Sequence, residues 1–181
     1  MSHDNRRHPR GPVDERDAPE DRLTSPDVPT LYDWAGGGPA LERLTQTFYA
    51  RVKQDHLLAP VFAHMDDRHP HYVALFLAEV LGGPSSYSRE RGGHAHMLSR
   101  HLNRNLTETQ RRRWVDLLID SMDEAGLPAD PEFRSAFVAY IEWGTRLAVL
   151  NSQPGQEPVL DLPMPKWGWG VPGGPYRPGP S

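Results

Sequence analysis

The sequence predicts an all-helical protein. In four stretches between residues 31 and 152, apolar residues recur three or four positions apart, and no stretch shows the alternation typical of a strand. Residues that favour helix starts and stops stand at the ends of these stretches, namely Pro39, Pro70, Thr107 and Asp130 at starts and Gly82 and Gly126 at stops. Four such helices predict a compact two-layer helical domain of about 120 residues.

The first two predicted helices have the strongest apolar faces. The first begins at Pro39 and carries Leu41, Leu44, Phe48 and Val52. A short turn is expected around residues 57–62. The second begins at Pro70, and its paired apolar positions, Tyr72/Val73, Phe76/Leu77 and Val80/Leu81, indicate a wide buried face. Gly82-Gly83-Pro84 ends it.

The last two predicted helices are marked by their N-terminal residues. Thr107 and Gln110 have the spacing of a capping box, and the helix that they start runs to Gly126. Asp130-Pro131 starts the final helix. In residues 85–101, which are rich in glycine, serine and charge, only the last two turns are expected to be helical.

The two ends of the chain differ from this helical part. Residues 1–30 are charged and proline-rich with few apolar residues, so we expect a disordered extension. The proline- and glycine-rich residues 153–181 should form no regular structure. Their aromatic residues Trp167, Trp169 and Tyr176 could dock on the domain or on a partner, but a flexible tail is the preferred interpretation.

Composition excludes several classes of function. The 181 residues include no cysteine, which rules out disulfides, thiolate metal sites and cysteine nucleophiles. The formal net charge of −4 argues against nucleic acid as a partner. No apolar run is long enough to span a membrane, and the first 30 residues do not resemble a secretory signal, so we expect a cytoplasmic protein.

His101 is the residue that most suggests chemistry. With Met97 and Leu98 it is predicted to lie on the apolar face of a short helix. A buried imidazole needs partners for its nitrogens, so His101 is either a hydrogen-bonded core residue or a metal ligand. Tyr49 and Trp114 each have a large apolar body and one hydrogen-bonding atom, so each is either a core residue or part of a binding site. Residues 111–113, three arginines, are expected to form a solvated face in at least two of their members.

An ordered set of short motifs resembles the bacterial group II truncated haemoglobins. The set consists of Phe48-Tyr49, Phe62, Gly82-Gly83-Pro84, Tyr87-Ser88, Gly92, Met97, Arg100-His101 and Trp114. The resemblance covers residues 31–152. It implies a two-over-two helical sandwich around haem b, between a disordered N-terminal and a disordered C-terminal extension.

The resemblance also implies roles for individual residues. His101 would be the axial ligand of the haem iron, and Tyr49 and Trp114 would donate hydrogen bonds to a diatomic ligand on the opposite, distal side. The haem pocket would be lined by Phe62, Phe76, Leu77, Met97 and Leu102. Arg100 and Tyr87 would reach a haem propionate, and His69 and Val73 would pass over the iron.

Two residues depart from the usual family pattern. Phe62 stands where many members have a second tyrosine. His69 stands where many members have a small residue, and it could bond the ligand, swing outward as a gate or cap the helix. His64 and His71 flank the same region.

The leading hypothesis is therefore a haem protein that binds oxygen, nitric oxide and carbon monoxide and releases oxygen slowly. An enzymatic alternative is nitric oxide dioxygenase or peroxidase-like activity. It would need a separate reductase, because the sequence has no flavin or nicotinamide motif. A haem-free helical interaction module that acts through its tails is the third hypothesis.

Overall fold

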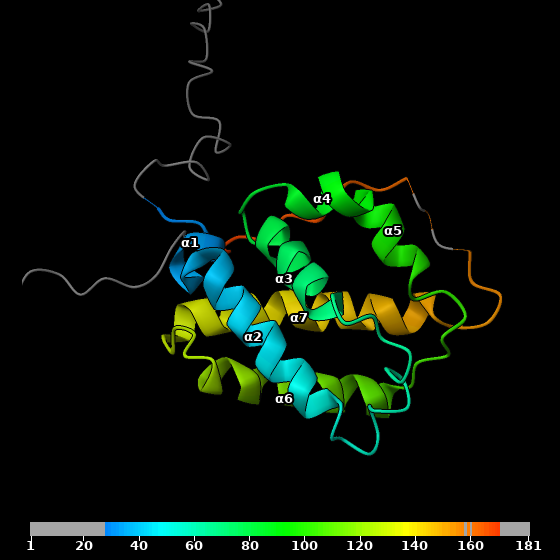
Figure 1. The fold of residues 1–181 in the computed structure, drawn as a ribbon. Helices are drawn as coiled ribbons and strands as arrows, with labels where there is room; N and C mark the ends of the chain where they lie inside the picture. Colours follow the sequence, from blue (N-terminus) through cyan, green and yellow to red (C-terminus); the bar gives the residue numbers. More distant parts are fainter. Residues whose placement is uncertain (1–27, 158, 160, 171–181) are drawn as a thin grey trace, which may run out of the picture.

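The computed structural model describes residues 28–157, 159 and 161–170, and the regular structure in this part of the chain is entirely helical (Figure 1). The helices are α1 (Leu31–Ala35), α2 (Gly37–Val52), α3 (His69–Val80), α4 (Ser86–Arg91), α5 (Gly93–Ser99), α6 (Glu108–Glu124) and α7 (Pro131–Asn151). The expected all-helical class is confirmed.

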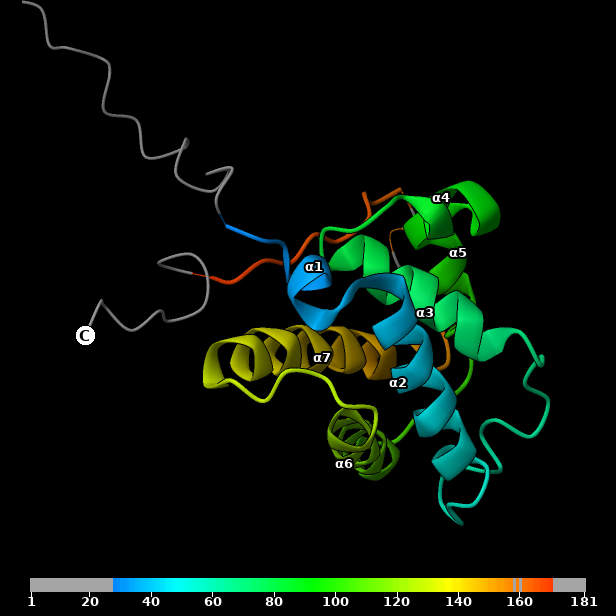
Figure 2. The same cartoon turned by 60° about the vertical axis from the view of Figure 1, so that its left-hand side comes forward.

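The four long helices form two layers. Helices α2 and α3 pack against each other and cross over α6 and α7, which also pack together (Figures 1 and 2). Fully buried side chains from the four helices meet between the layers, among them Leu41, Leu44, Phe48, Val80, Leu118, Met122, Phe133 and Phe137. Burial of this apolar surface is the main stabilising contribution to the sandwich.

The predicted helix starts agree with the structure to within two residues. Thr107 and Gln110 form the reciprocal capping box of α6, and the Asp130 side chain accepts a hydrogen bond from the Phe133 amide at the start of α7. Helix α3 begins at His69, so Pro70 lies in its first turn. Helix α2 begins at Gly37 rather than Pro39, because Gly36 adopts a left-handed conformation that ends α1 and starts α2.

Two predictions for residues 85–101 are wrong. Residues 86–91 form α4, held on α3 because the Ser88 amide and hydroxyl both donate to the buried carboxylate of Glu79. Gly92 and Gly93, with φ of 85° and 70°, then separate α4 from α5. Helix α5 ends at Ser99, so His101 lies in the turn that follows this helix and not on its face.

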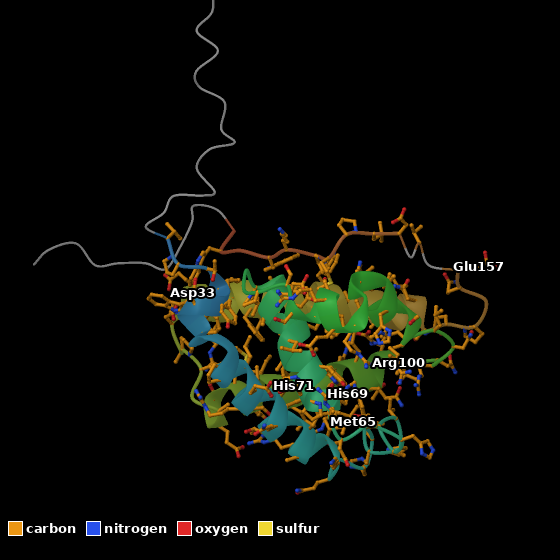
Figure 3. All side chains as sticks on the ribbon, turned by 45° about the horizontal axis from the view of Figure 1, so that its top comes forward. Asp33, Met65, His69, His71, Arg100 and Glu157 are labelled. Atoms are coloured by element: carbon orange, nitrogen blue, oxygen red, sulfur yellow. The ribbon has the colours of Figure 1, made fainter. Side chains whose placement is uncertain are left out.

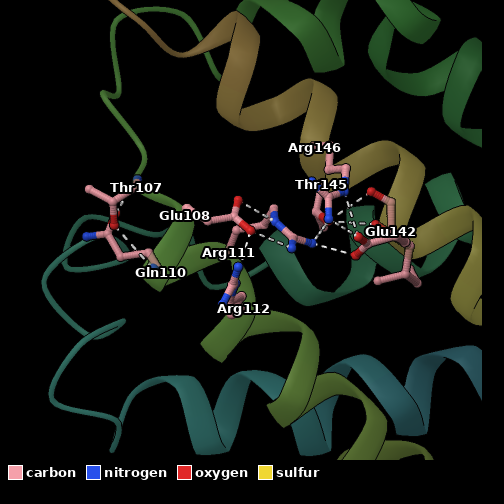
Figure 4. Close-up of polar contacts among 9 residues, drawn as sticks. Thr107, Glu108, Gln110, Arg111, Arg112, Glu142, Thr145 and Arg146 are labelled. Carbon is pink, nitrogen blue, oxygen red and sulfur yellow. Dashed lines mark hydrogen bonds and ion pairs between the residues drawn. The ribbon is translucent and has the colours of Figure 1, made fainter.

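The arginine run ties α6 to its neighbours. Arg112 and Arg113 are exposed, as expected, but Arg111 is buried. Its guanidinium donates to Glu108 on α6 and to Glu142 on α7 (Figure 4). Arg113 donates to Asp55 in the turn after α2.

Residues 161–170, which we call the C-terminal strap, pack on the helical domain. The Trp167 amide donates to the Val80 carbonyl, and the Trp169 indole donates to the Pro29 carbonyl. The Trp169 ring also meets Trp34 edge to face, with ring centroids 5.8 Å apart. The strap has no regular secondary structure, as predicted, but the preferred interpretation of a flexible tail is wrong for these two tryptophans.

The other predictions for the chain ends lie largely outside the described residues. Of the expected disordered extension, only residues 28–30 are described, and Tyr176 lies beyond the described part of the tail. Within the described residues, each helix is too short or too polar to cross a membrane.

Candidate functional site

His101 is held by a hydrogen bond to its own chain. Its Nδ1 atom lies 3.0 Å from the carbonyl oxygen of Met97. Because a carbonyl can only accept, Nδ1 carries the proton and donates it. Burial lowers the pKa of His101, although the Met97 hydrogen bond opposes this, so the ring is neutral at pH 7. Among the described residues Nε2 has no hydrogen-bond partner, and its lone pair is therefore available.

The turn after His101 is anchored to the end of α7. The Asn105 amide donates to the Ser152 carbonyl, and the Leu106 amide donates to the Ser152 hydroxyl. Ser152 is completely buried. Because these bonds connect residues more than 45 positions apart, no short stretch of the sequence indicates the role of Ser152.

Tyr49 and His69 form a pair between α2 and α3. The Tyr49 hydroxyl lies 2.9 Å from Nε2 of His69, and the two rings meet edge to face. Burial, with a smaller contribution from the positive charge of Arg100, lowers the pKa of His69 to about 4, so His69 is neutral at pH 7. Burial raises the pKa of Tyr49, which keeps its hydroxyl protonated.

Trp114 reaches the same region from α6. Its ring meets the Phe48 ring edge to face, with centroids 4.8 Å apart, and Phe48 meets Tyr49 in the same way. The indole is half-buried, and among the described residues its Nε1 has no hydrogen-bond partner. Aromatic contacts thus connect His69 on α3 to Tyr49 on α2, and Phe48 on α2 to Trp114 on α6.

The other predicted pocket residues fall into two groups. Phe76 and Leu77 are buried in the core. The rest keep part of their apolar surface exposed, namely Phe62, Val73, Met97 and Leu102. The Phe62 ring packs edge to face against Tyr49. Partly exposed apolar side chains near polar donors are typical of a ligand pocket.

Arginine side chains, among them Arg100 and Arg91, form a cationic edge beside the site. Arg100 lies near His69, on the side where α5 approaches the start of α3, and its charge lowers the pKa of His69 (Figure 3). Tyr87 is buried against Phe76, and burial raises its pKa, whereas the charges of Arg91 and Arg100 oppose this rise. The pairing of Arg100 and Tyr87 with a propionate stays a prediction.

Sequence reasoning missed Arg91 at this edge. Its guanidinium lies 4.1 Å from the centre of the Tyr72 ring and donates to Nε2 of His96. Arg68 approaches the same Tyr72 ring at 5.0 Å. The arginines and aromatic rings thereby connect α4 to the start of α3. Tyr72 appeared in the sequence only as a member of an apolar pair, so no pattern distinguished it.

The residues of this site fit a haem group. A neutral imidazole with a free nitrogen is one of the protein groups that bind haem iron. Tyr49 and Trp114 supply O–H and N–H groups from α2 and α6, and Arg100 supplies a positive charge suited to carboxylates. His69 and His101 are close enough for the charge of one to affect the pKa of the other.

Comparison with known proteins identifies the family of this chain. Residues 30–142 match the profile of the bacterial-like globin family. A group 2 truncated haemoglobin of Bacillus subtilis is 34% identical over 94 residues, which cover 52% of this chain and 70% of that protein.

Solved structures have the same fold. A truncated oxygen-avid haemoglobin from Bacillus subtilis is similar with a TM-score of 0.60 and 30% identity, over 67% of this chain and 99% of that one. The group II truncated haemoglobin from Bacillus anthracis is similar with a TM-score of 0.61 and 26% identity, over 70% of this chain and 96% of that one.

Proposed function

Because the chain belongs to the bacterial-like globin family, whose cofactor is haem, we propose that it binds oxygen with His101 as the axial ligand and releases it slowly. Haem iron held by one imidazole supplies an open axial position for a diatomic gas. Family membership does not agree with the alternative of a haem-free interaction module. The hydrogen bond between His101 Nδ1 and the Met97 carbonyl is the observation that carries this proposal.

The Met97 bond supports axial ligation in two ways. It fixes the tautomer, because a proton on Nδ1 leaves the lone pair on Nε2 for the metal. It also fixes the orientation of the ring, and the carbonyl acceptor raises the basicity of the ligand. The anchoring of Asn105 and Leu106 on Ser152 restrains the chain on the C-terminal side of His101.

Slow release is supported by two hydrogen-bond donors, Tyr49 and Trp114, that would stand on the distal side. The Tyr49 hydroxyl and the Trp114 indole each have a proton to donate to a polar ligand. A hydrogen bond to a charged acceptor contributes about 1.5–3 kcal/mol, or roughly ten- to a hundredfold in affinity. Such a gain appears mainly as a slower release rate. Nitric oxide and carbon monoxide fit the same position, and carbon monoxide, being less polar, would gain less.

The cationic edge has a separate role in this proposal. Arg100, together with Tyr87, would orient the cofactor by holding a carboxylate at the mouth of the site. A reaction that consumes electrons would also require a reductase from outside this chain, since the sequence contains no flavin or nicotinamide motif.

Titration of the full-length protein with haem tests the proposed function. We expect saturable uptake of one haem per chain and, in the reduced protein, a stable oxygenated absorption spectrum that is replaced on adding carbon monoxide. Failure to take up haem, or oxidation without any oxygenated spectrum, would contradict the proposal.

A further inference from the structure

In the hydrogen bond between Tyr49 and His69, either residue can be the donor, depending on the tautomer of the imidazole. The Tyr49 side chain is 3% exposed, and His69 Nε2 is the hydrogen-bond partner of its hydroxyl among the described residues. The two ring centroids are 4.9 Å apart and the planes are nearly perpendicular, at 83°. Phe62 packs against both rings. The pair is thus enclosed, and its one hydrogen bond has a defined geometry.

Two arrangements of protons are compatible with this contact. A neutral imidazole carries its proton on either Nδ1 or Nε2. If Nδ1 carries it, Tyr49 donates to His69, and the hydroxyl proton is no longer available to a ligand. If Nε2 carries it, His69 donates to the Tyr49 oxygen, and the hydroxyl proton is free to point elsewhere.

A ligand with a polar acceptor favours the second arrangement. It then receives a hydrogen bond from Tyr49 while the bond between Tyr49 and His69 is kept, so two hydrogen bonds are made instead of one. A hydroxyl that accepts one hydrogen bond also becomes a better donor of its own proton, since linked hydrogen bonds polarise one another. The first arrangement requires the existing bond to break before Tyr49 can reach the ligand.

We propose that His69 is a positioning residue that acts through Tyr49, because its Nε2–H donates to the Tyr49 oxygen and directs the hydroxyl proton toward the ligand. This inference rests on the proposed function. It differs from the three roles suggested by the sequence. The Nε2 atom is engaged with Tyr49 rather than free for a ligand, the ring points into the protein, and the side chain caps no helix.

A double-mutant cycle on the full-length, haem-loaded protein tests this proposal. The rate of oxygen release is measured for the wild type, His69→Leu, Tyr49→Phe and the combined variant. We expect His69→Leu to speed release about three- to tenfold, the effect of one hydrogen bond. In the Tyr49→Phe background the same change should have almost no effect, because the residue through which His69 acts is gone.

Two further variants separate positioning from packing. His69→Gln keeps an N–H donor at this position and should restore at least part of the slow release. His64→Leu removes an exposed histidine from the preceding turn and should leave the rate unchanged. The infrared stretch of bound carbon monoxide gives a second readout, and it should shift in His69→Leu but show no further shift when Tyr49 is already phenylalanine.

Several results would overturn the inference. Equal effects of His69→Leu in both backgrounds would mean that His69 acts on the ligand directly. Slower release in His69→Leu would mean that His69 withdraws the Tyr49 proton rather than directing it. An unchanged rate of oxygen release in His69→Leu would mean that His69 has no role in holding the ligand. Absence of an oxygenated wild-type spectrum is a different outcome, because it overturns the proposed function itself.

Discussion

The Nδ1 atom of His101 donates to the carbonyl oxygen of Met97, four residues earlier and near the end of α5, over 3.0 Å. This bond compensates for the position of His101 just beyond the helix, where the backbone no longer determines the direction of the side chain. It leaves Nε2 free, and burial keeps the ring neutral. The axial role proposed for His101 follows from these two properties.

The donor role proposed for Trp114 predicts different effects on two gases. Trp114→Phe removes the indole N–H and keeps an aromatic ring against Phe48, so we expect oxygen release to become about ten- to a hundredfold faster. Carbon monoxide release should change much less, because that ligand carries little charge. Stopped-flow displacement measures both rates. Trp143→Phe, on the exposed side of α7, is the matched control and should leave both unchanged. A similar acceleration for both gases would contradict the assignment of Trp114 as a donor.

The hydrogen bonds that Arg111 donates to Glu108 and Glu142 predict a pH-dependent contribution to stability. Hydrogen bonding to Arg111 lowers the pKa of Glu108 from 4.5 to about 2. A carboxylate with a lowered pKa in the folded state stabilises the protein above its unfolded pKa, and this contribution is lost as the pH falls toward the folded pKa.

The substitution Arg111→Met removes this contribution. At pH 7 we expect it to lower the free energy of unfolding by about 1–3 kcal/mol, because Arg111 is buried and makes charged hydrogen bonds. The difference from the wild type should shrink as the pH falls from about 5 to about 2. Urea unfolding at several pH values measures it, and a difference that does not vary with pH would show that Arg111 acts by packing alone.

The C-terminal strap predicts that residues outside the matched globin region affect stability. Trp167 contacts α3 and the aromatic rings of α7, and Trp169 contacts α1. Trp167→Ala and Trp169→Ala should each lower the free energy of unfolding by about 1–3 kcal/mol. Val159→Ala, at a side chain that is 65% exposed, should have almost no effect. Tryptophan variants as stable as the wild type would mean that the strap is not bound in solution.

The helix boundaries could be predicted where the signal is local. Thr107 and Gln110 are three residues apart, and Asp130 bonds an amide three residues later, so their roles are visible in the sequence. Helix α4 had no such signal, because the carboxylate that holds Ser88 comes from Glu79 on another helix. Its glycine-, serine- and charge-rich sequence therefore indicated a loop.

The family resemblance proposes members for the site but does not give the contacts between them. Tyr49, Trp114 and His101 were expected from the family resemblance. The bond between Tyr49 and His69 depends on how α2 crosses α3, and the bond between Trp169 and Pro29 joins residues 140 positions apart. Neither is a property of any short stretch of sequence. The position of His101 beyond the helix end also required the structure, because apolar spacing continues past the last helical turn.

The resonance Raman spectrum of the ferrous, haem-loaded protein tests the axial role of His101 most directly. The wild type and the control His96→Ala should show an iron–histidine stretching band. His101→Gly should lose it, and free imidazole should restore a corresponding band by occupying the space of the missing ring. An unchanged iron–histidine band in His101→Gly would mean that another residue holds the iron, and it would contradict the axial role proposed for His101.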